Sequence, residues 1–234
     1  MFFFDWTYLL IVLPVALIAF WASANVQSTF ARYSRQLNRR RMTGAEAARI
    51  VLDQNGLRHI RIERVQGSLT DHYDPRQETI FLSETVYDRA TSAAVGVAAH
   101  EAGHAIQHAT GYLPIRLRSA IIPITNIGSR LAFPLILIGI LLSAFGEVFA
   151  VIAYIGIGCY ALTAVFQLVT LPTEFNASRR ALAAIENTQL LYEDEVKGTR
   201  RVLRAAALTY VAALAVSLAQ ILRLFIIVRG NDRR

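Results

Sequence analysis

The chain has 234 residues, of which 54% are hydrophobic and only 18% are charged. Soluble domains usually carry about 25% charged residues, so this composition favours a protein embedded in a membrane bilayer over a soluble domain. The formal net charge is +7, and Cys159 is the single cysteine, which excludes an internal disulfide. Basic and aromatic residues are not interleaved along the chain, so the positive charge does not indicate a nucleic-acid partner.

Residues 1–27 are expected to form the first transmembrane helix. Residues 8–24 carry no charge, and with the apolar residues before them they reach the roughly 20 residues that a span needs. No basic stretch precedes this segment, which favours a retained helix over a cleaved signal peptide. The positive-inside rule then puts the following side in the cytosol, because the next charged residues are all arginines: Arg32, Arg35, Arg39, Arg40 and Arg41.

Residues 28–118 are expected to form a small zincin-like α+β domain. Thr43 and Glu46 have the spacing of a capping box before a helix over residues 47–55, and Gly56 is a plausible end for that helix. Apolar and polar residues alternate over 60–65, which predicts a half-exposed strand. The residues at 71–75 have turn chemistry.

A short apolar strand is expected next, followed by a helix of small residues over 90–106. In a zincin-type domain an edge strand beside the metal can pair with an extended peptide. The expected substrate strand is therefore Thr79, Ile80, Phe81 and Leu82. An ordinary buried strand is the alternative interpretation of the same four residues.

The most informative feature of the sequence is the pentapeptide His100-Glu101-Ala102-Gly103-His104. Histidines four apart on a helix lie about 40° apart around its axis and about 6 Å apart along it. Both imidazoles can then bind one tetrahedral zinc, and Glu101 can act as a base on a metal-bound water. Gly103 is expected to permit close approach of another element.

The spacing alone leaves the third ligand open. His108 continues the series, but it lies about 12 Å from His100 along the axis, so we expect it beside a ligand or on the surface. His59 and His72 are either ligands or solvated imidazoles. Glu174 follows the third apolar segment and is expected to open a helix over 175–186, where a carboxylate serves either as a metal ligand or as a partner of the helix dipole.

The rest of the chain is divided by its apolar runs. Residues 119–173 are expected to form a transmembrane hairpin that turns near Gly146, residues 174–204 a helix with the third metal ligand, and residues 205–234 the last span and tail. Arg223 interrupts the last span, where it is expected to extend to the interface. An even number of crossings separates residues 42–112 from residues 172–204, so the two polar segments can meet on one face of the membrane.

A family resemblance adds to this interpretation. The turn at 71–75, the pentapeptide and the segment 171–181 (LPTEFNASRRA) together resemble the YugP-type neutral zinc metallopeptidases of bacterial membranes, and the match covers nearly the whole chain. The layout is more distantly similar to the HtpX class of membrane gluzincins. The resemblance implies a predicted peptidase with one Zn²⁺ per chain and Glu174 as third ligand. The HtpX class usually has Asp four residues after that Glu, where this chain has Ser178, so no carboxylate partner for a zinc histidine is expected there.

We therefore expect a mainly α membrane protein with about four transmembrane helices and a small α+β zincin-like domain. Its expected function is zinc-dependent hydrolysis of peptide or membrane-protein substrates at the cytosolic face of the bacterial inner membrane, with Glu101 as general base. The residues expected to contact the reaction oxyanion or the ligands are Tyr73, His108, Asn176, Ser178 and Arg179.

Two alternatives remain at this stage. A non-catalytic zinc-binding membrane scaffold or adaptor would normally close its zinc with four protein ligands, often cysteines, and no cysteine lies near the pentapeptide. An intramembrane protease of the site-2 type carries the same pentapeptide on a spanning helix. The apolar run at 91–99 is far shorter than a span.

Overall fold

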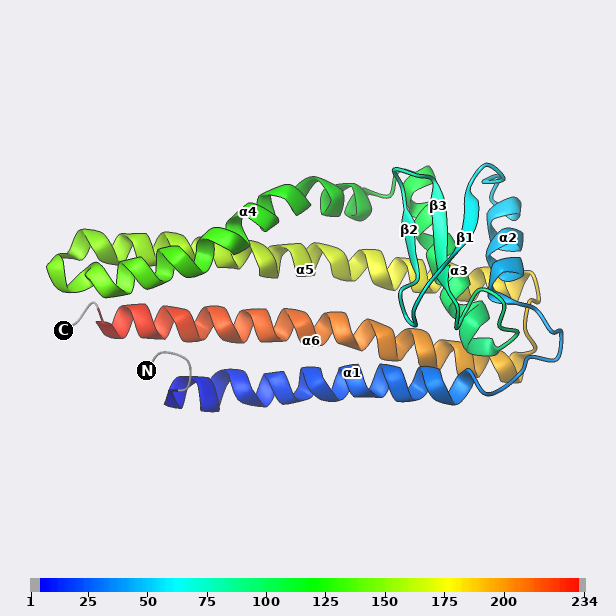
Figure 1. The fold of residues 1–234 in the computed structure, drawn as a ribbon, viewed down its shortest axis with the longest axis horizontal. Coiled ribbons are helices and arrows are strands. Elements are labelled where there is room, and N and C mark those ends of the chain that lie inside the picture. Colours follow the sequence, from blue (N-terminus) through cyan, green and yellow to red (C-terminus); the bar gives the residue numbers. More distant parts are fainter. Residues whose placement is uncertain (1–4, 232–234) are drawn as a thin grey trace. The chain divides into compact units, whose positions relative to one another are not determined.

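The structure is a computed structural model that describes residues 5–231 (Figure 1). The chain divides into two compact units. The first, here called the membrane unit, comprises residues 5–22, 117–171 and 209–231; the second, the site unit, comprises residues 23–116 and 172–208. Four long helices each contribute residues to both units along a continuous backbone: α1, α4, α5 and α6.

The described residues contain four helices that are long and apolar enough to cross a membrane. This confirms the prediction of a mainly α membrane protein with four spans. The helices are η1 with α1 (Tyr8–Val12 and Leu13–Tyr33), α4 (Leu113–Leu142), α5 (Glu147–Asn187) and α6 (Glu193–Asn231).

Helices α4 and α5 form the expected hairpin, joined by the short helix η2 (Ser143–Phe145) and Gly146. A Cβ atom added at Gly156 would lie 2.8 Å from the backbone nitrogen of Ile136, so the two helices pack with their backbones close together. Small residues at such contacts are typical of helix pairs in membranes. Helix α4 contains Pro123 and Pro134 and is visibly bent in Figure 1.

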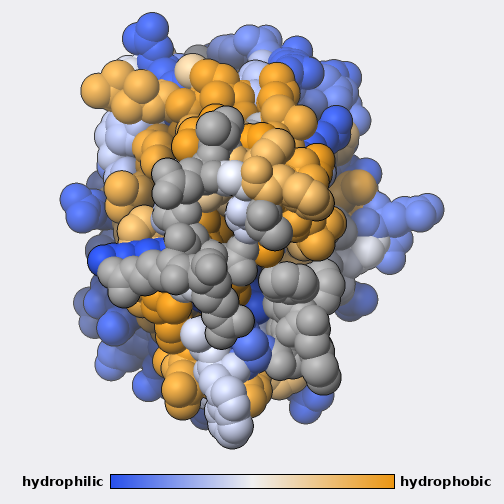
Figure 2. Space-filling view, turned by 90° about the vertical axis from the view of Figure 1, so that its left-hand side faces the viewer, coloured by the Kyte–Doolittle hydropathy of each residue, from blue (hydrophilic) through white to orange (hydrophobic). Residues whose placement is uncertain are grey.

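Large apolar side chains of the membrane unit face outward, among them Leu10, Phe20 and Ile127. Figure 2 shows apolar residues gathered on the face that it presents. Arg223 of α6 has an acidic partner in the membrane unit. It is buried, its Nε lies 3.3 Å from Asp5 Oδ1, and its guanidinium lies over the ring of Tyr8. The opposite charge compensates the arginine inside an otherwise apolar helix bundle.

The site unit contains a three-stranded sheet with the order β1-β3-β2 (Figure 1). Strand β1 (Arg61–Val65) pairs in parallel with β3 (Thr79–Ser83), and β2 (His72–Asp74) pairs antiparallel with β3 on the other side. The sheet and the helices α2 (Gly44–Gln54) and α3 (Ser92–Ala109) confirm the expected α+β part of the fold.

The prediction of a substrate edge strand at Thr79, Ile80, Phe81 and Leu82 is wrong. These residues form the central strand, since β1 and β2 occupy its two sides and all but Phe81 are buried. The outer antiparallel strand is β2, within the segment expected to turn. The turn itself begins at Asp74, whose carboxylate accepts from the backbone N–H of Arg76. Hydrophobicity indicates how deeply a strand is buried, but not which strands it lies between.

The start of α2 follows the sequence prediction. The Thr43 hydroxyl accepts from the backbone N–H of Glu46, and the Glu46 carboxylate accepts from the backbone N–H of Thr43 at 2.8 Å. Gly56 follows the helix with φ of 73°, which favours glycine. The apolar faces of α2, α3 and β3 bury one core, which also takes in Ile185 of α5.

The expected helix start at Glu174 is also wrong. Helix α5 continues unbroken from Glu147 to Asn187, with Pro172 inside it. Proline removes one backbone hydrogen bond, but helices in membrane proteins tolerate this loss when neighbouring groups compensate. Glu174 therefore lies in a helix interior, which excludes the interpretation of its carboxylate as a partner of a helix N-terminus.

Candidate metal centre

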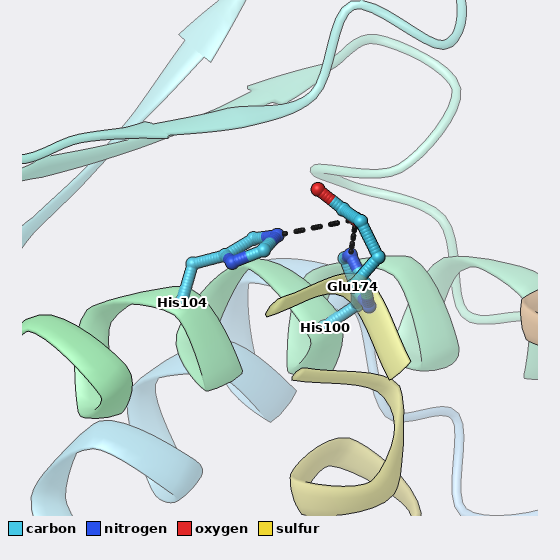
Figure 3. Close-up of side chains that lie close together, drawn as sticks. All are labelled: His100, His104 and Glu174. Carbon is cyan, nitrogen blue, oxygen red and sulfur yellow. Dashed lines mark ion pairs between the residues drawn. The ribbon is translucent and has the colours of Figure 1, made fainter. Parts of the chain in front are cut away.

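Helix α3 places both histidines on one face. The helix begins after Thr91, whose hydroxyl accepts from the backbone N–H of Ala94 at 3.2 Å. Six buried residues of α3 are alanines, whose small side chains let neighbouring helices approach closely. They are Ala93, Ala94, Ala98, Ala99, Ala102 and Ala105. His100 and His104 project from this helix toward Glu174 of α5 (Figure 3).

Gly103 sets the separation of α3 and α5, as the sequence predicted. A Cβ atom at this position would lie 2.8 Å from the carbonyl oxygen of Ala177 and 3.2 Å from its Cα. Both of these atoms belong to the backbone, which cannot turn aside as a flexible side chain can. The close approach brings Glu174, one turn before Ala177, over the two histidines.

We expect Gly103→Ala to destabilise the protein by about 1–3 kcal/mol, because the added methyl group pushes α3 away from α5. The midpoint of thermal unfolding in detergent measures this change. Gly158→Ala is the matched control, since nothing lies within 4 Å of a Cβ added there. Equal unfolding midpoints for the two variants would show that the helices can separate without cost.

Three possible ligand atoms converge between the helices. The Oε2 atom of Glu174 lies 3.3 Å from Nε2 of His100 and 3.6 Å from Nε2 of His104 (Figure 3). All three atoms lie within 4.8 Å of one another. Ligands about 2.0–2.1 Å from a tetrahedral zinc are separated by about 3.3 Å, so the donor set and its spacing fit this ion. The side chain of Glu174 is 4% exposed and that of His100 is 15% exposed, so solvent reaches the imidazole of His100 more easily than the carboxylate of Glu174.

The charges around the cluster also favour a cation. Burial disfavours the charged form of His104, but the carboxylates of Glu174 and Glu101 outweigh this effect and raise the pKa of His104. Nearby Asp71 is half-buried. Its burial raises the pKa of its carboxyl despite two hydrogen bonds from Ser83, and the negative charge of Glu101 adds to the increase. The site thus concentrates negative charge in a region of low dielectric.

Each imidazole has a hydrogen-bond partner at its other nitrogen. Ser178 Oγ lies 3.1 Å from Nδ1 of His100, so a hydroxyl takes the place of the carboxylate that the HtpX class usually carries. Gln107 Oε1 lies 3.0 Å from Nδ1 of His104. Sequence reasoning missed Gln107, although its position three residues after His104 puts it on the same helix face.

The other predicted residues lie around this cluster. Asn176 Oδ1 accepts from Gln107 Nε2 and from Arg180 Nε, and Arg179 is exposed. The rings of Tyr73 and His108 lie in contact, with their centres 5.6 Å apart. Burial, with the charges of Glu78 and Asp74, raises the pKa of Tyr73, so its phenol keeps its proton.

The two histidines considered as alternative ligands do not join the cluster. His59 is exposed, and His72 is exposed on β2, where its ring stacks on that of Phe81. Helix α3 is not among the four candidate spans in the described part of the chain. His100 and His104 therefore do not lie on a candidate span, whereas Glu174 lies on α5, which is one of the four.

Comparisons with known proteins agree with this chemistry. The family model described as "putative neutral zinc metallopeptidase" matches residues 8–229. A protein of Bacillus subtilis (strain 168) named "Putative membrane protease YugP" is 44% identical over 216 residues, which cover 92% of this chain and 94% of that protein. No solved structure matches the chain.

Proposed function

The chain belongs to the neutral zinc metallopeptidase family, and on that premise we propose that it is a membrane-embedded peptidase that hydrolyses peptide bonds at one zinc ion. The observation that carries this proposal is the convergence of His100, His104 and Glu174 from two helices, next to the buried carboxylate of Glu101. The zinc centre is that of a gluzincin, with two histidines and one glutamate as ligands.

His100 and His104 would bind the metal through Nε2, and Glu174 through Oε2. The cluster holds three protein ligands among residues 5–231, which leaves a position for water or substrate. Catalytic zinc sites keep such a position, whereas structural sites normally close it with a fourth protein ligand. This difference supports a peptidase over a zinc-binding scaffold.

Glu101 would move the proton that the reaction requires. Bound zinc supplies a Lewis acid that polarises the scissile carbonyl and makes water a nucleophile near neutral pH. Glu101 takes the proton from the attacking water and delivers it to the leaving amine. Its burial and its place on α3 between the two histidines would hold its carboxylate beside the metal-bound water. Tyr73 can donate a hydrogen bond to the developing oxyanion, because its phenol stays protonated.

The substrate would lie along β2 rather than along β3. Among the described strands β2 is the outer one beside α3, and its residue Tyr73 contacts His108, one turn beyond His104. An extended peptide that adds to this strand by main-chain hydrogen bonds would run past the metal ligands. The excess of arginine after the first span supports a cytosolic position for this metal centre in a bacterial inner membrane.

The test combines metal analysis with proteolysis. We expect the protein purified in detergent to contain one zinc per chain and to cleave an unfolded membrane protein. A chelator should abolish the cleavage, and a stoichiometric addition of Zn²⁺ should restore it. Cleavage that continues at full rate after complete removal of metal would overturn the proposal, as would a purified protein with no affinity for zinc.

A further inference from the structure

Gln107 is a buried polar side chain that the peptidase mechanism does not use. It lies on α3 and is fully buried. Its amide makes three hydrogen bonds: Oε1 lies 3.0 Å from Nδ1 of His104, while Nε2 donates to the carbonyl oxygen of Thr173 at 2.8 Å and to Oδ1 of Asn176 at 3.0 Å. Thr173 is the residue immediately before Glu174.

The direction of these hydrogen bonds follows from neighbouring groups that can act only as a donor or only as an acceptor. A backbone carbonyl only accepts, so the amide nitrogen of Gln107 must face Thr173. The guanidinium of Arg180 only donates, so Asn176 presents its oxygen to it, and that oxygen also accepts from Gln107. The remaining atom of Gln107, its oxygen, therefore faces His104 and requires a hydrogen on Nδ1.

The consequence for His104 is a fixed tautomer. With a hydrogen held on Nδ1, the lone pair of the neutral imidazole lies on Nε2, which is the atom 3.6 Å from Glu174 Oε2. His100 is held less strictly. Its partner is the hydroxyl of Ser178, which can turn and either donate or accept.

We propose that Gln107 is a positioning residue that sets the metal-binding tautomer of His104. Through its hydrogen bond to Thr173, Gln107 also holds the turn of α5 that carries Glu174 close enough for Glu174 to bind the metal. One side chain thereby couples two of the three ligands, which come from different helices. This inference rests on the proposed zinc site. Hydrogen-bond partners of metal ligands typically change metal affinity by 10–100-fold when they are removed.

The first test is the zinc affinity of Gln107→Leu, measured by competition with a chelating dye. Leucine fills a similar volume without hydrogen bonds, so we expect zinc to bind about 10–100-fold more weakly. Gln107→Glu should recover most of the affinity, because a buried protonated carboxyl can accept from His104 and donate to Thr173. Gln54→Leu makes the same change at an exposed position of α2 and should bind zinc like the wild type.

Unchanged affinity in Gln107→Leu would reduce Gln107 to a packing residue and overturn the inference, while zinc binding by the wild type would leave the peptidase proposal standing. Absence of zinc binding in the wild type would overturn both.

A second measurement needs no variant that might fail to fold. NMR of the zinc-loaded wild type, labelled with ¹⁵N at histidine, should show an Nδ1–H proton of His104 that is protected from exchange with water. Coordination of zinc through Nδ1 of His104, or exchange of that proton as fast as in a solvated imidazole, would contradict the assignment.

Discussion

Glu101→Gln is expected to retain one zinc per chain and to lower the cleavage rate by about 10²–10⁴-fold, the usual contribution of a positioned acid–base group. The amide keeps the size of the side chain but cannot take a proton from water. The buried position of Glu101 on α3, between the two histidines of the candidate metal centre, makes an isosteric change the least disruptive one. Zinc content by atomic absorption and cleavage of an unfolded membrane protein are measured on the same preparation.

Glu84→Gln is the matched control, because Glu84 is exposed, lies 3.8 Å from Arg64 and is not among the three residues of the candidate metal centre. It should cleave at the wild-type rate. Proteolysis by Glu101→Gln at a rate close to that of the control would remove Glu101 from the mechanism while leaving the metal centre in place.

Glu174→Ala is expected to weaken zinc binding by more than about 100-fold, beyond the loss caused by removing a hydrogen-bond partner of a ligand. Two imidazoles on one helix then remain, and the metal loses the only anionic ligand of the set. Dialysis against a zinc buffer followed by metal analysis measures the change. Cleavage should be lost in parallel and should return in part at high zinc concentration.

Glu186→Ala tests the same change farther along α5, where the carboxylate is exposed and binds Arg200 at 2.8 Å. It should leave the zinc affinity unchanged. If Glu174→Ala instead retains zinc at the wild-type level, the ligand set is wrong and His59 and His72 become the residues to replace next.

The sequence predicted the features that depend on local periodicity. The four spans follow from apolar runs of sufficient length, and the orientation of His100 and His104 follows from their separation by four residues on a helix. The capping box at Thr43 is local as well. Gly103 indicated a close approach, but not that its partner is Ala177 of α5. Glu174 came from the family resemblance, since its own spacing left two interpretations open.

What the sequence did not predict depends on contacts between distant segments. Strand order cannot be derived from the hydrophobicity of 79–82, because pairing with β1 and β2 decides it. The continuation of α5 through Pro172 depends on its surroundings more than on proline itself. The role of Gln107 appears only when its partner Thr173, 66 residues away, is known.

The brevity of β2 has a consequence for selectivity. With three residues, this strand can align only about 10 Å of an added chain by main-chain pairing. A substrate held over so short a length is recognised by its extended backbone and contributes few side chains to the choice. Such a strand would accept many sequences and would discriminate mainly against polypeptides that stay folded.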